Sequence, residues 1–326
     1  MTNLVGIGMK GQIGYGEEST YGTSATRSYW QEINNESLVL QEARIETNSL
    51  TRRGTLNRQV AQGARSVTGN IEFDAQYGGW GKLAKHAFGQ IDTTSPDPTN
   101  APTAKLHTFT VADTLPTGLT FEAFRDTSGF TTEPNKAHVY VGCKINTMEF
   151  SCAVNEILKI NLGIMGQNES REAKGTPNYS TEKLAVYHQG CVTWGSTDRP
   201  IESFNIQLNN NLEMRPKLCS NLTREPIQSG KVEITGSFSM EFDTWAEYDD
   251  FKAATERQLE VDFTGPLIAA TTYKMIKLIC PVVILSGVNM NLSSFGRIKV
   301  DINFKGYRDS TQNEFKLQII NTETGI

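Results

Sequence analysis

The feature that most constrains this chain is a short pattern that occurs once in each half. In Val67–Phe73 (VTGNIEF) and Ile234–Met240 (ITGSFSM), apolar residues or glycine alternate with polar residues. Both segments begin with an apolar residue followed by Thr-Gly. Alternation of this kind predicts a β-strand with one buried face. Its recurrence predicts that the chain contains two copies of one structural unit.

A helical pattern comes after each of these strands. The first begins at Trp80 and the second at Trp245. Apolar residues then recur at helical spacing, at Leu83, Ala84, Ala87 and Phe88 in the first copy and at Tyr248 and Phe251 in the second. This spacing places apolar side chains on one helix face. We therefore expect one flanking helix per copy, with both tryptophans packed in a core.

Segments before and after the two strands extend the match. Arg44–Leu50 is aligned with Ile206–Leu212, and Leu158–Gly166 with Ile298–Gly306. The spacing between matched segments leaves an insertion in the first copy, near residues 91–136. Its Pro-rich and Thr-rich part, residues 93–102, is expected to be an exposed loop, because proline cannot donate a backbone hydrogen bond.

The length of the chain and one polar stretch suggest how it is divided. The chain has 326 residues, and a single core stops growing at roughly 250–300 residues. Residues 166–182 are polar and contain Gly, Pro and Ser, so the boundary is placed there. We expect a Gly-rich N-terminal arm (1–36), a first domain (37–172) and a second domain (173–326). The expected fold class is mainly β, with two tandem β-sandwich or barrel domains, each with one flanking α-helix.

Charge and composition exclude several classes of protein. The net charge of -5 and the pI near 5.6 argue against a protein that clamps nucleic acid through phosphate contacts. The first residues lack the pattern of a secretory signal, and no apolar run is long enough for a membrane span. The five cysteines are odd in number and scattered, which favours free thiols over a disulfide framework.

No residue pattern predicts catalysis or a cofactor. Gly6, Gly8 and Gly11 have the G-x-G-x-x-G spacing, but the next residues are Gly-rich and do not form an apolar helical pattern, so a flexible arm is expected. The histidines lack the paired spacing of metal ligands, and no C-x-x-C occurs. Nucleophile-elbow, Walker A and H-E-x-x-H motifs are also missing from the sequence. We expect a protein with no catalytic residues, no cofactor and no metal.

Two segments have opposite charge. Residues 47–71 contain arginines and no acidic residue, whereas residues 241–262 are strongly acidic. One interpretation is two solvated faces; the other is complementary docking between neighbouring copies or rings, in which charge sets register and rate more than affinity. The candidate docking residues are Arg52, Arg53, Arg58, Arg65, Glu247, Asp249 and Asp250.

The arrangement resembles the tail tube proteins of long-tailed bacteriophages, in particular a family with two tube folds per chain. The opening GYGEESTYGT at residues 14–23, with Trp30 and then Glu-Ser-Leu at residues 36–38 after it, is similar to the start of that family. The Thr-Gly strand with its helix is the second shared feature. The third is the apolar run Ile276–Val283 (IKLICPVV) with its proline. The resemblance spans nearly the whole chain except residues 91–136.

This resemblance implies a structural protein of the virion tail, assembled in the cytoplasm of the bacterial host. Its chains would form rings that stack into a tube, in contact with tail tip, initiator and terminator proteins but not with a membrane. Two folds per chain would give trimeric, pseudo-hexameric rings. A barrel of 24 strands has a backbone diameter of roughly 48 Å and a channel of roughly 38 Å, wide enough for a DNA duplex that passes without specific binding.

Four segments are candidates for the strands that line the channel. They are residues 42–47, 147–151, 202–209 and 289–294, where polar and buried positions are expected to alternate. The candidate positions within them are Glu42, Arg44, Glu46, Glu149, Asn205, Gln207, Asn289 and Asn291.

Residues 1–22 are polar and Gly-rich, so they are expected to order only against a neighbouring ring. Two alternatives to the tube remain. The first is another structural β-protein, of a tail tip, a head-tail connector or a capsid decoration. The second is a carbohydrate-binding module that stacks sugars on aromatic side chains, which the shared placement of Trp80 and Trp245 disfavours.

Overall fold

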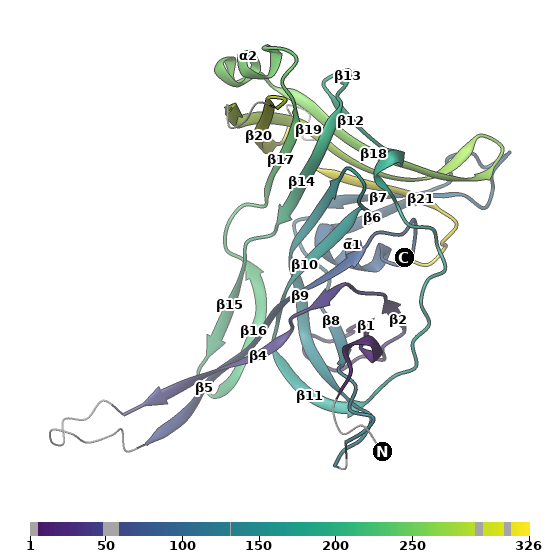
Figure 1. The fold of residues 1–326 in the computed structure, drawn as a ribbon. Helices are drawn as coiled ribbons and strands as arrows, with labels where there is room; N and C mark the ends of the chain where they lie inside the picture. Colours follow the sequence, from purple (N-terminus) through teal and green to yellow (C-terminus); the bar gives the residue numbers. More distant parts are fainter. Residues whose placement is uncertain (1–5, 48–58, 131, 291–295, 310–313) are drawn as a thin grey trace.

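A computed structural model describes residues 6–47, 59–130, 132–290, 296–309 and 314–326 (Figure 1). The fold is mainly β, as predicted. The described residues contain two α-helices, α1 (Gly81–Phe88) and α2 (Ala246–Ala253), and each comes after a Thr-Gly strand as expected. Over those ranges, no helix has the length and hydropathy needed to cross a membrane.

Strands and two 3₁₀ segments make up the other regular structure. In chain order they are η1 (Gly8–Lys10), β1 (Gln12–Glu17), β2 (Tyr29–Gln31), β3 (Asn35–Glu36), β4 (Val39–Glu46), β5 (Val60–Asp74), β6 (Gly89–Thr94), β7 (Lys105–Val111), β8 (Leu119–Phe124), β9 (Lys136–Ala153), β10 (Lys159–Gly166), β11 (Asn168–Ala173), η2 (Tyr187–Gln189), β12 (Gly190–Trp194), β13 (Thr197–Asp198), β14 (Ile201–Asn209), β15 (Leu212–Lys217), β16 (Ser220–Gln228), β17 (Glu233–Glu241), β18 (Arg257–Ala269), β19 (Thr272–Met290), β20 (Lys299–Tyr307) and β21 (Lys316–Asn321).

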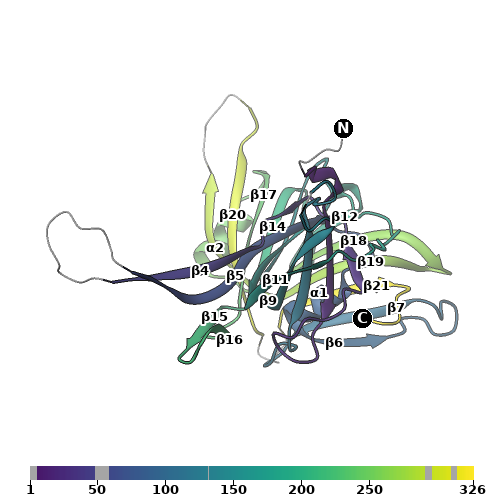
Figure 2. The same ribbon diagram turned by 90° about the horizontal axis from the view of Figure 1, so that it is seen from below.

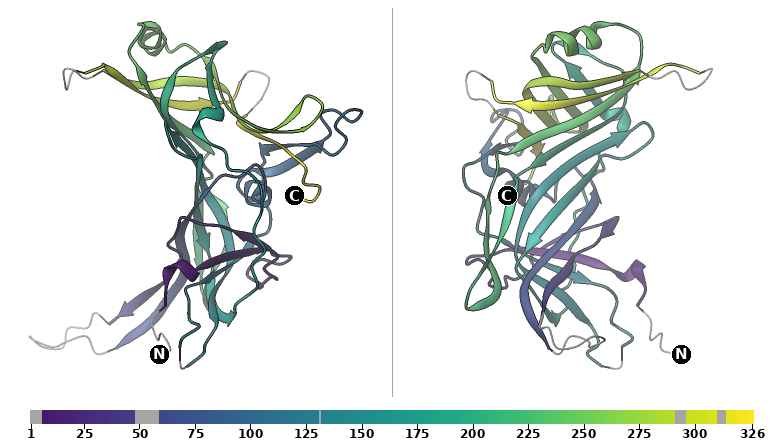
Figure 3. Two further views of the ribbon diagram at one scale, coloured as in Figure 1. Left: turned by 45° about the vertical axis from the view of Figure 1, so that its right-hand side comes forward. Right: turned by 90° about the vertical axis from the view of Figure 1, so that its left-hand side faces the viewer.

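One continuous antiparallel sheet runs through the molecule. Its strand order is β4-β5-β10-β9-β14-β17-β20-β19, and the β9–β14 pair joins the first half of the chain to the second. Figure 3 shows the sheet as a long curved layer, with α2 near one end and the N-terminal residues near the other. The four strands from the first half of the chain therefore lie side by side in one part of the sheet, and the four strands from the second half lie in the other.

Alternation along the strands separates a buried face from a polar one. Ile160, Leu162 and Ile164 of β10 are buried, whereas the residues between them are partly exposed. On the buried face α1 contributes Leu83 and Phe88 to the same apolar cluster. Each large apolar side chain buried in this way contributes roughly 1.5–3 kcal/mol, so this face carries the core.

The registers at the two Thr-Gly strands correspond closely. Ile164 lies opposite Gly69 in the β10–β5 pair, and Phe304 lies opposite Gly236 in the β20–β17 pair. The β10–β9 and β20–β19 pairs both contain a register shift next to these positions, between Gly163 and Ile164 in the first and between Leu285 and Gly287 in the second. Residues 159–166 and 299–306 thus pair with the two Thr-Gly strands in the same register.

The match predicted upstream of the Thr-Gly strands is wrong by several residues. Val39 lies opposite Thr68 and Gln207 lies opposite Thr235, so Val39, not a residue near Arg44, is the counterpart of Gln207. The error arose because β4 continues beyond the body into a projecting hairpin with β5 (Figure 2). The sequence of residues 42–46 (EARIE) still alternates between polar and apolar residues although residues 43–46 are all exposed, so periodicity alone could not identify the register.

A second layer of strands packs over the buried face. The first part of β9 pairs with β8 and β11, β8 pairs with β1, and β1 pairs with β2. In the second half β19 pairs with β18 and β21, β18 with β12, and β12 with β13. Ile13 and Tyr15 of β1 are fully buried. The expectation that residues 1–22 order only against a neighbouring ring is therefore wrong for β1, because alternate apolar side chains anchor it in the core.

The inserted region holds more structure than the predicted loop. It contains β7, β8 and the end of β6, and Thr93 and Thr94 pair with His107 and Leu106. The β6–β7 hairpin also reaches the second half, because β7 pairs with β21. Residues 95–104, which contain Pro96, Pro98 and Pro102, form the loop between β6 and β7, so the loop has the expected length but begins two residues later.

The two tryptophans at the helix starts differ in environment. Trp80 is fully buried, and its indole N–H donates to the Gln76 carbonyl oxygen over 2.7 Å. Trp245 is 60% exposed. The expectation that both pack in a core is therefore correct for Trp80 and wrong for Trp245, because no segment of the described chain covers the second helix as the first is covered.

Glu17 at the end of β1 joins this strand to α1. Its carboxylate oxygens lie 2.8 Å from Lys82 Nζ, 3.0 Å from Lys85 Nζ and 3.2 Å from His86 Nε2. The hydrogen bond with His86, together with the two lysines, holds the pKa of Glu17 well below its usual 4.5. Burial lowers the pKa of His86 below its usual 6.5.

These two shifts predict loss of stability in acid. The unfolded chain takes up protons at His86 below about pH 6.5 and at Glu17 below about pH 4.5, whereas the folded chain does so only at lower pH. The free energy of unfolding should therefore fall as the pH decreases, with roughly 1–2 kcal/mol of the loss due to Glu17. Urea denaturation at several pH values measures this, with Glu17→Gln as the comparison. Equal pH dependence of the two proteins below pH 5 would contradict the assignment.

Candidate functional site: the polar sheet face and its free edges

The outer face of the central sheet carries a row of polar side chains. Direct strand partners place Glu72, Asn161, Glu149, Gln207, Thr235 and Lys305 side by side across β5, β10, β9, β14, β17 and β20. Asn161 Nδ2 donates to Glu149 Oε2 over 3.5 Å, and Asn205 Nδ2 donates to Glu149 Oε1. Neighbouring amides thus fix the position of this carboxylate on the face.

Lysines on this face lie beside carboxylates. Lys305 Nζ is 2.7 Å from Glu233 Oε1, and hydrogen bonding within this pair lowers the pKa of Glu233 and raises the pKa of Lys305. Lys159 Nζ is 3.6 Å from Glu156 Oε2, and Lys299 contacts Glu202. The carboxylates of Glu72, Glu149 and Asp301 have no ion pair with a lysine or arginine of the described chain. The face is therefore acidic and lacks an array of free cations.

The predicted lining positions fall into three groups. Glu149, Asn205, Gln207 and Asn289 lie on the polar face. Glu42, Arg44 and Glu46 lie on β4, where the β4–β5 hairpin leaves the body, and Glu42 is 3.2 Å from Arg44 Nη1 and 3.7 Å from Arg65 Nε. Asn291 lies outside the described residues.

The central sheet ends in two strands whose outer edges are not paired within the described residues. The first is β4, which pairs only with β5. The second is the last part of β19, residues 284–290, which pairs only with β20. Ser37 N–H donates to the Asn70 carbonyl oxygen, so by alternation the N–H and C=O of Leu40 point away from β5. Val39 on this edge is 46% exposed.

The acidic residues predicted for docking have different surroundings. Glu247 is buried and lies 2.9 Å from Arg199 Nη2, and Asp250 is buried between Arg257 Nη2, at 2.9 Å, and the Trp194 indole N–H, at 3.2 Å. Both hold α2 against the strands beneath it. Asp249 is exposed on the other side of the helix.

Of the four arginines predicted for docking, only Arg65 lies within the described residues. Arg65 of β5 is half-buried near Glu42. Arg52, Arg53 and Arg58 are outside the described residues. The docking hypothesis therefore depends on Asp249 on the acidic side and on the hairpin arginines on the basic side.

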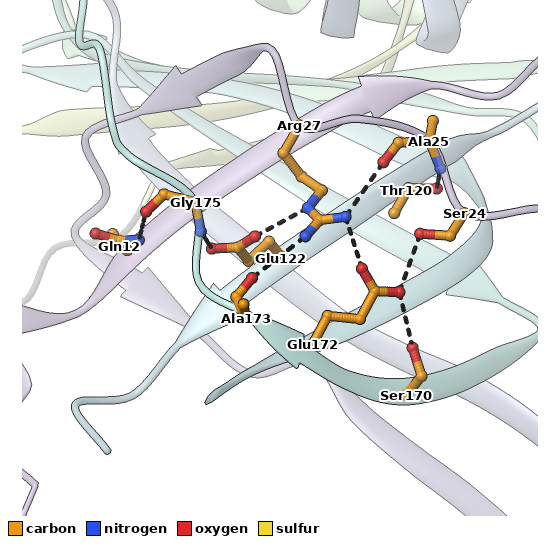
Figure 4. Close-up of polar contacts among 10 residues, drawn as sticks. All are labelled: Gln12, Ser24, Ala25, Arg27, Thr120, Glu122, Ser170, Glu172, Ala173 and Gly175. Carbon is orange, nitrogen blue, oxygen red and sulfur yellow. Dashed lines mark hydrogen bonds and ion pairs between the residues drawn. The ribbon is translucent and has the colours of Figure 1, made fainter. Parts of the chain in front are cut away.

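A buried ionic network has a structural rather than a chemical role. Arg27 Nε lies 2.9 Å from the fully buried carboxylate of Glu122, and Arg27 Nη1 lies 2.8 Å from Glu172 (Figure 4). Glu122 also accepts the N–H of Gly175 over 2.7 Å, and Gln12 donates to the Gly175 carbonyl oxygen over 3.1 Å. The network ties β1, β8 and β11 to the start of the segment that leads to the second half.

Reactive groups are not assembled elsewhere in the described chain. Its histidines, cysteines and carboxylates include no cluster that could hold a metal ion. The five cysteines are free, and only Cys219 is exposed. Burial raises the pKa of Cys152 to about 11, so this thiol is not a nucleophile near neutral pH.

Comparison with known proteins gives one family. A family described as phage tail tube protein matches residues 8–306, which is nearly the whole chain. No curated protein matches the chain significantly.

Proposed function

The chain belongs to the phage tail tube protein family, and on that premise we propose that its copies close into rings, that the rings stack into the tail tube, and that genomic DNA passes through the channel during ejection. The polar sheet face would line this channel. The protein is a structural component of the virion tail, and we assign it no catalytic step. Its partners would be other copies of itself and the initiator, tip and terminator proteins of the tail.

The observation that carries this proposal is the β9–β14 junction inside the chain. Met148 of β9 lies opposite Leu208 of β14 in a pair of strands that joins the two halves edge to edge. An edge-to-edge junction between two similar sheets is the contact that a closed barrel needs between its subunits. The chain would thus contain one internal copy of the contact that we propose between chains.

The two free edges are the counterparts of the strands at this junction. Leu40 lies opposite Val67, one residue before Thr68, as Leu208 lies opposite Ile234, one residue before Thr235. Likewise Val288 lies opposite Ile302 as Met148 lies opposite Leu162. We therefore expect β19 of one copy to pair with β4 of the next, with Val288 opposite Leu40.

This arrangement gives the number of chains per ring. We propose two tube folds per chain, residues 37–172 and 173–326 with β1–β3 added to the first, and each contributes four strands to the sheet. Three chains then supply the 24 strands of a ring with a channel of roughly 38 Å. The contact is head-to-tail, and such contacts close into a ring when the rotation per copy allows it.

The charge of the polar face suits a channel that DNA must leave. Because its lysines are paired with carboxylates, the face offers no cation array that would release counterions from phosphates. DNA would therefore slide through the channel without specific binding.

Added cations on this face should make the channel retain DNA. Thr68→Lys with Thr235→Lys adds two lysines per chain at corresponding positions of β5 and β17, hence six per ring of three. We expect assembled tubes of this variant to bind a short DNA duplex at low salt and to release it as salt rises. Co-sedimentation of labelled DNA with the tubes measures this. Tubes with Thr68→Gln and Thr235→Gln are the control, and equal retention by both variants would contradict the lumen assignment.

Docking between copies or rings is proposed to use the exposed carboxylate of Asp249 and the hairpin arginines. Asp249→Lys should shorten the tubes formed at low salt, while Asp249→Asn should have a smaller effect, because charge sets the register and rate of docking. Tube length in electron micrographs is the readout. Unchanged length for the lysine variant would remove Asp249 from the docking surface.

Electron microscopy of the purified protein over a concentration series tests the proposal as a whole. Stacked rings with a central channel support the tube. A single closed ring, or monomers, at every concentration would instead favour a connector, a capsid decoration or another structural role in the tail.

A further inference from the structure

The second half of the chain has a groove at one end of its two layers. The groove has a volume of about 690 Å³. It lies between the start of β17 and the end of β20 in the central sheet, and between the end of β7 and the residue before β21 in the second layer. A groove with an apolar wall suits a large apolar side chain, because contact removes both surfaces from water. The apolar side chains of the wall are Val111, Val232, Ile234, Pro281, Tyr307 and Phe315.

The corresponding end of the first half holds an aromatic side chain. By strand register, Tyr307 at the end of β20 is the counterpart of Gln167 after β10. Tyr21 lies beside Gln167, because a Cβ placed on Gly142 would meet both side chains within 2.9 Å. Tyr21 belongs to the long connection from β1 to β2, whereas β12 and β13, which take the corresponding places beside β18, are joined by a tight turn. The second half therefore has a groove at the end where the first half has the Tyr21 ring.

The start of α2 presents an exposed aromatic side chain next to a carboxylate. Trp245 is 60% exposed, and its ring centroid lies 5.0 Å from that of Phe242 and 5.8 Å from that of Tyr248. Asp249 N–H donates to the Trp245 carbonyl oxygen over 2.9 Å, so the two residues are one helical turn apart and share a helix face. Asp249 is exposed and has no ion pair with a lysine or arginine of the described chain. This face of α2 therefore combines an indole with a free carboxylate.

The groove and α2 lie at opposite ends of β17. The strand begins at the groove and ends shortly before α2 (Figure 1). Its nine residues span roughly 30 Å, so the two surfaces cannot meet within one chain. Barrel strands tilt by about 40° to the channel axis, which places the two surfaces on opposite faces of the proposed ring. Complementary surfaces at opposite ends of a molecule join copies head to tail and give an open filament when the contacts do not close.

The charged side chains of the groove favour an incoming carboxylate on one side. Lys305 and Arg308 each lie beside a glutamate oxygen, at 2.7 Å and 3.7 Å. Lys231, before β17, is exposed and has no ion pair with a carboxylate of the described residues. Asp113, after β7, is also exposed and would repel a second carboxylate. A carboxylate from another copy would therefore pair with Lys231, on the β17 side of the groove.

We infer that Trp245 of one ring inserts into the groove of the next ring, and that Asp249 of the same helix pairs with Lys231 there. The inference rests on the proposed stack of rings and names a contact that joins them. The second half thus receives from another ring the kind of side chain that Tyr21 supplies in the first half. Tryptophan buries a large apolar area and often dominates the energy of an interface. Lys231 joins the hairpin arginines as the basic side of the docking proposed for Asp249.

Trp245→Ala should give closed rings that do not stack. The variant should fold and unfold at the same urea concentration as wild-type protein, because the side chain is mostly exposed. Three contacts are lost between each pair of rings, so the protein concentration needed for tubes should rise by about a hundredfold or more. Tyr273→Ala is the matched control, since Tyr273 is 47% exposed and lies outside both surfaces. Electron microscopy over a concentration series should show tubes of the control at wild-type concentrations.

Exchange of the two charges tests the register of the contact. Asp249→Lys alone and Lys231→Glu alone each place like charges together and should shorten the tubes formed at low salt. The double variant restores a pair of opposite charges and should restore tube length, because the two substitutions are coupled. Asp249→Lys with Lys217→Glu is the matched control. It has the same net charge, but its new glutamate lies on the β15–β16 hairpin outside the groove, so the tubes should stay short.

Tryptophan fluorescence reports the insertion directly. Of the four tryptophans, Trp30, Trp80 and Trp194 are buried and only Trp245 is exposed. A blue shift of the emission when rings stack should therefore come from Trp245. Trp245→Phe keeps an aromatic ring for the groove, so this variant should form tubes without the blue shift.

These measurements separate the inference from the proposed function. Tubes of Trp245→Ala at wild-type concentrations, or wild-type tubes that form without the blue shift, would overturn the inference and leave the tube intact. Failure of the charge exchange to restore tube length would overturn the pairing of Asp249 with Lys231. If wild-type protein forms neither rings nor tubes at any concentration, both proposals are overturned. Unstacked rings of Trp245→Ala together with the restored length and the blue shift would support both.

Discussion

Deletion of residues 1–22 is expected to unfold the protein. The deletion removes β1, which lies between β2 and β8 and buries Ile13 and Tyr15 in the core. Each of these side chains contributes roughly 1.5–3 kcal/mol, and β8 would also lose its partner strand. Together these losses approach the total stability of a typical domain, about 5–15 kcal/mol. Circular dichroism and urea denaturation should show no cooperative transition.

The matched control is deletion of residues 1–6, which leaves β1 in place. This shorter deletion should change the free energy of unfolding by less than about 1 kcal/mol, because it leaves the buried Ile13 and Tyr15 in the core. A cooperative transition in the protein that lacks residues 1–22 would contradict the role of β1. That result would mean that residues 1–22 form an arm on which the folding of the core does not depend.

Leu40→Pro is expected to prevent ring closure while leaving the monomer folded. The Leu40 N–H points away from β5, so proline removes no hydrogen bond of the ladder inside the chain. In the proposed junction this N–H would bind the next copy, and an unsatisfied partner costs about 1–3 kcal/mol. With three junctions per ring, assembly should weaken by several orders of magnitude. Sedimentation velocity over a concentration series measures the change.

Leu40→Ala is the control for this substitution, because it removes the same side chain and retains the N–H. Both variants should unfold at similar urea concentrations, since the loss of leucine packing is common to them. Only the proline variant should remain monomeric at concentrations where wild-type protein assembles. Assembly of the proline variant at wild-type concentrations would show that the outer edge of β4 is not part of the junction.

The sequence predicted the parts of the fold that depend on local periodicity. The two Thr-Gly strands, the helices after them and the strands at residues 159–166 and 299–306 were predicted from alternation and helical spacing, and the structure contains these elements. The register upstream could not be predicted, because the sequence of β4 continues to alternate in the projecting hairpin, where its side chains are all exposed. Likewise, β1 was not predicted as a buried strand, because its glycines leave Ile13 and Tyr15 as its only apolar core residues.

The candidate site could be predicted only where local alternation identifies polar positions. Polar positions such as Glu149 and Gln207 were identified from alternation, but their common face depends on strand pairing far apart in sequence. The acidic segment around α2 looked uniform, yet Glu247 pairs with Arg199, between β13 and β14, and Asp250 pairs with Arg257 of β18. The exposure of Trp245 could not be predicted either, because the helical pattern is the same after both tryptophans and only the tertiary packing differs.

The mass of the smallest ring, measured by native mass spectrometry together with electron microscopy, tests the central claim most directly. The chain has a mass of 36.1 kDa, and we predict a ring of three chains with six-fold-like symmetry and a central channel. This result would mean that the β9–β14 junction inside the chain and the β19–β4 junction between chains alternate around one barrel. A ring of six chains, or a protein that stays monomeric at every concentration, would contradict the account.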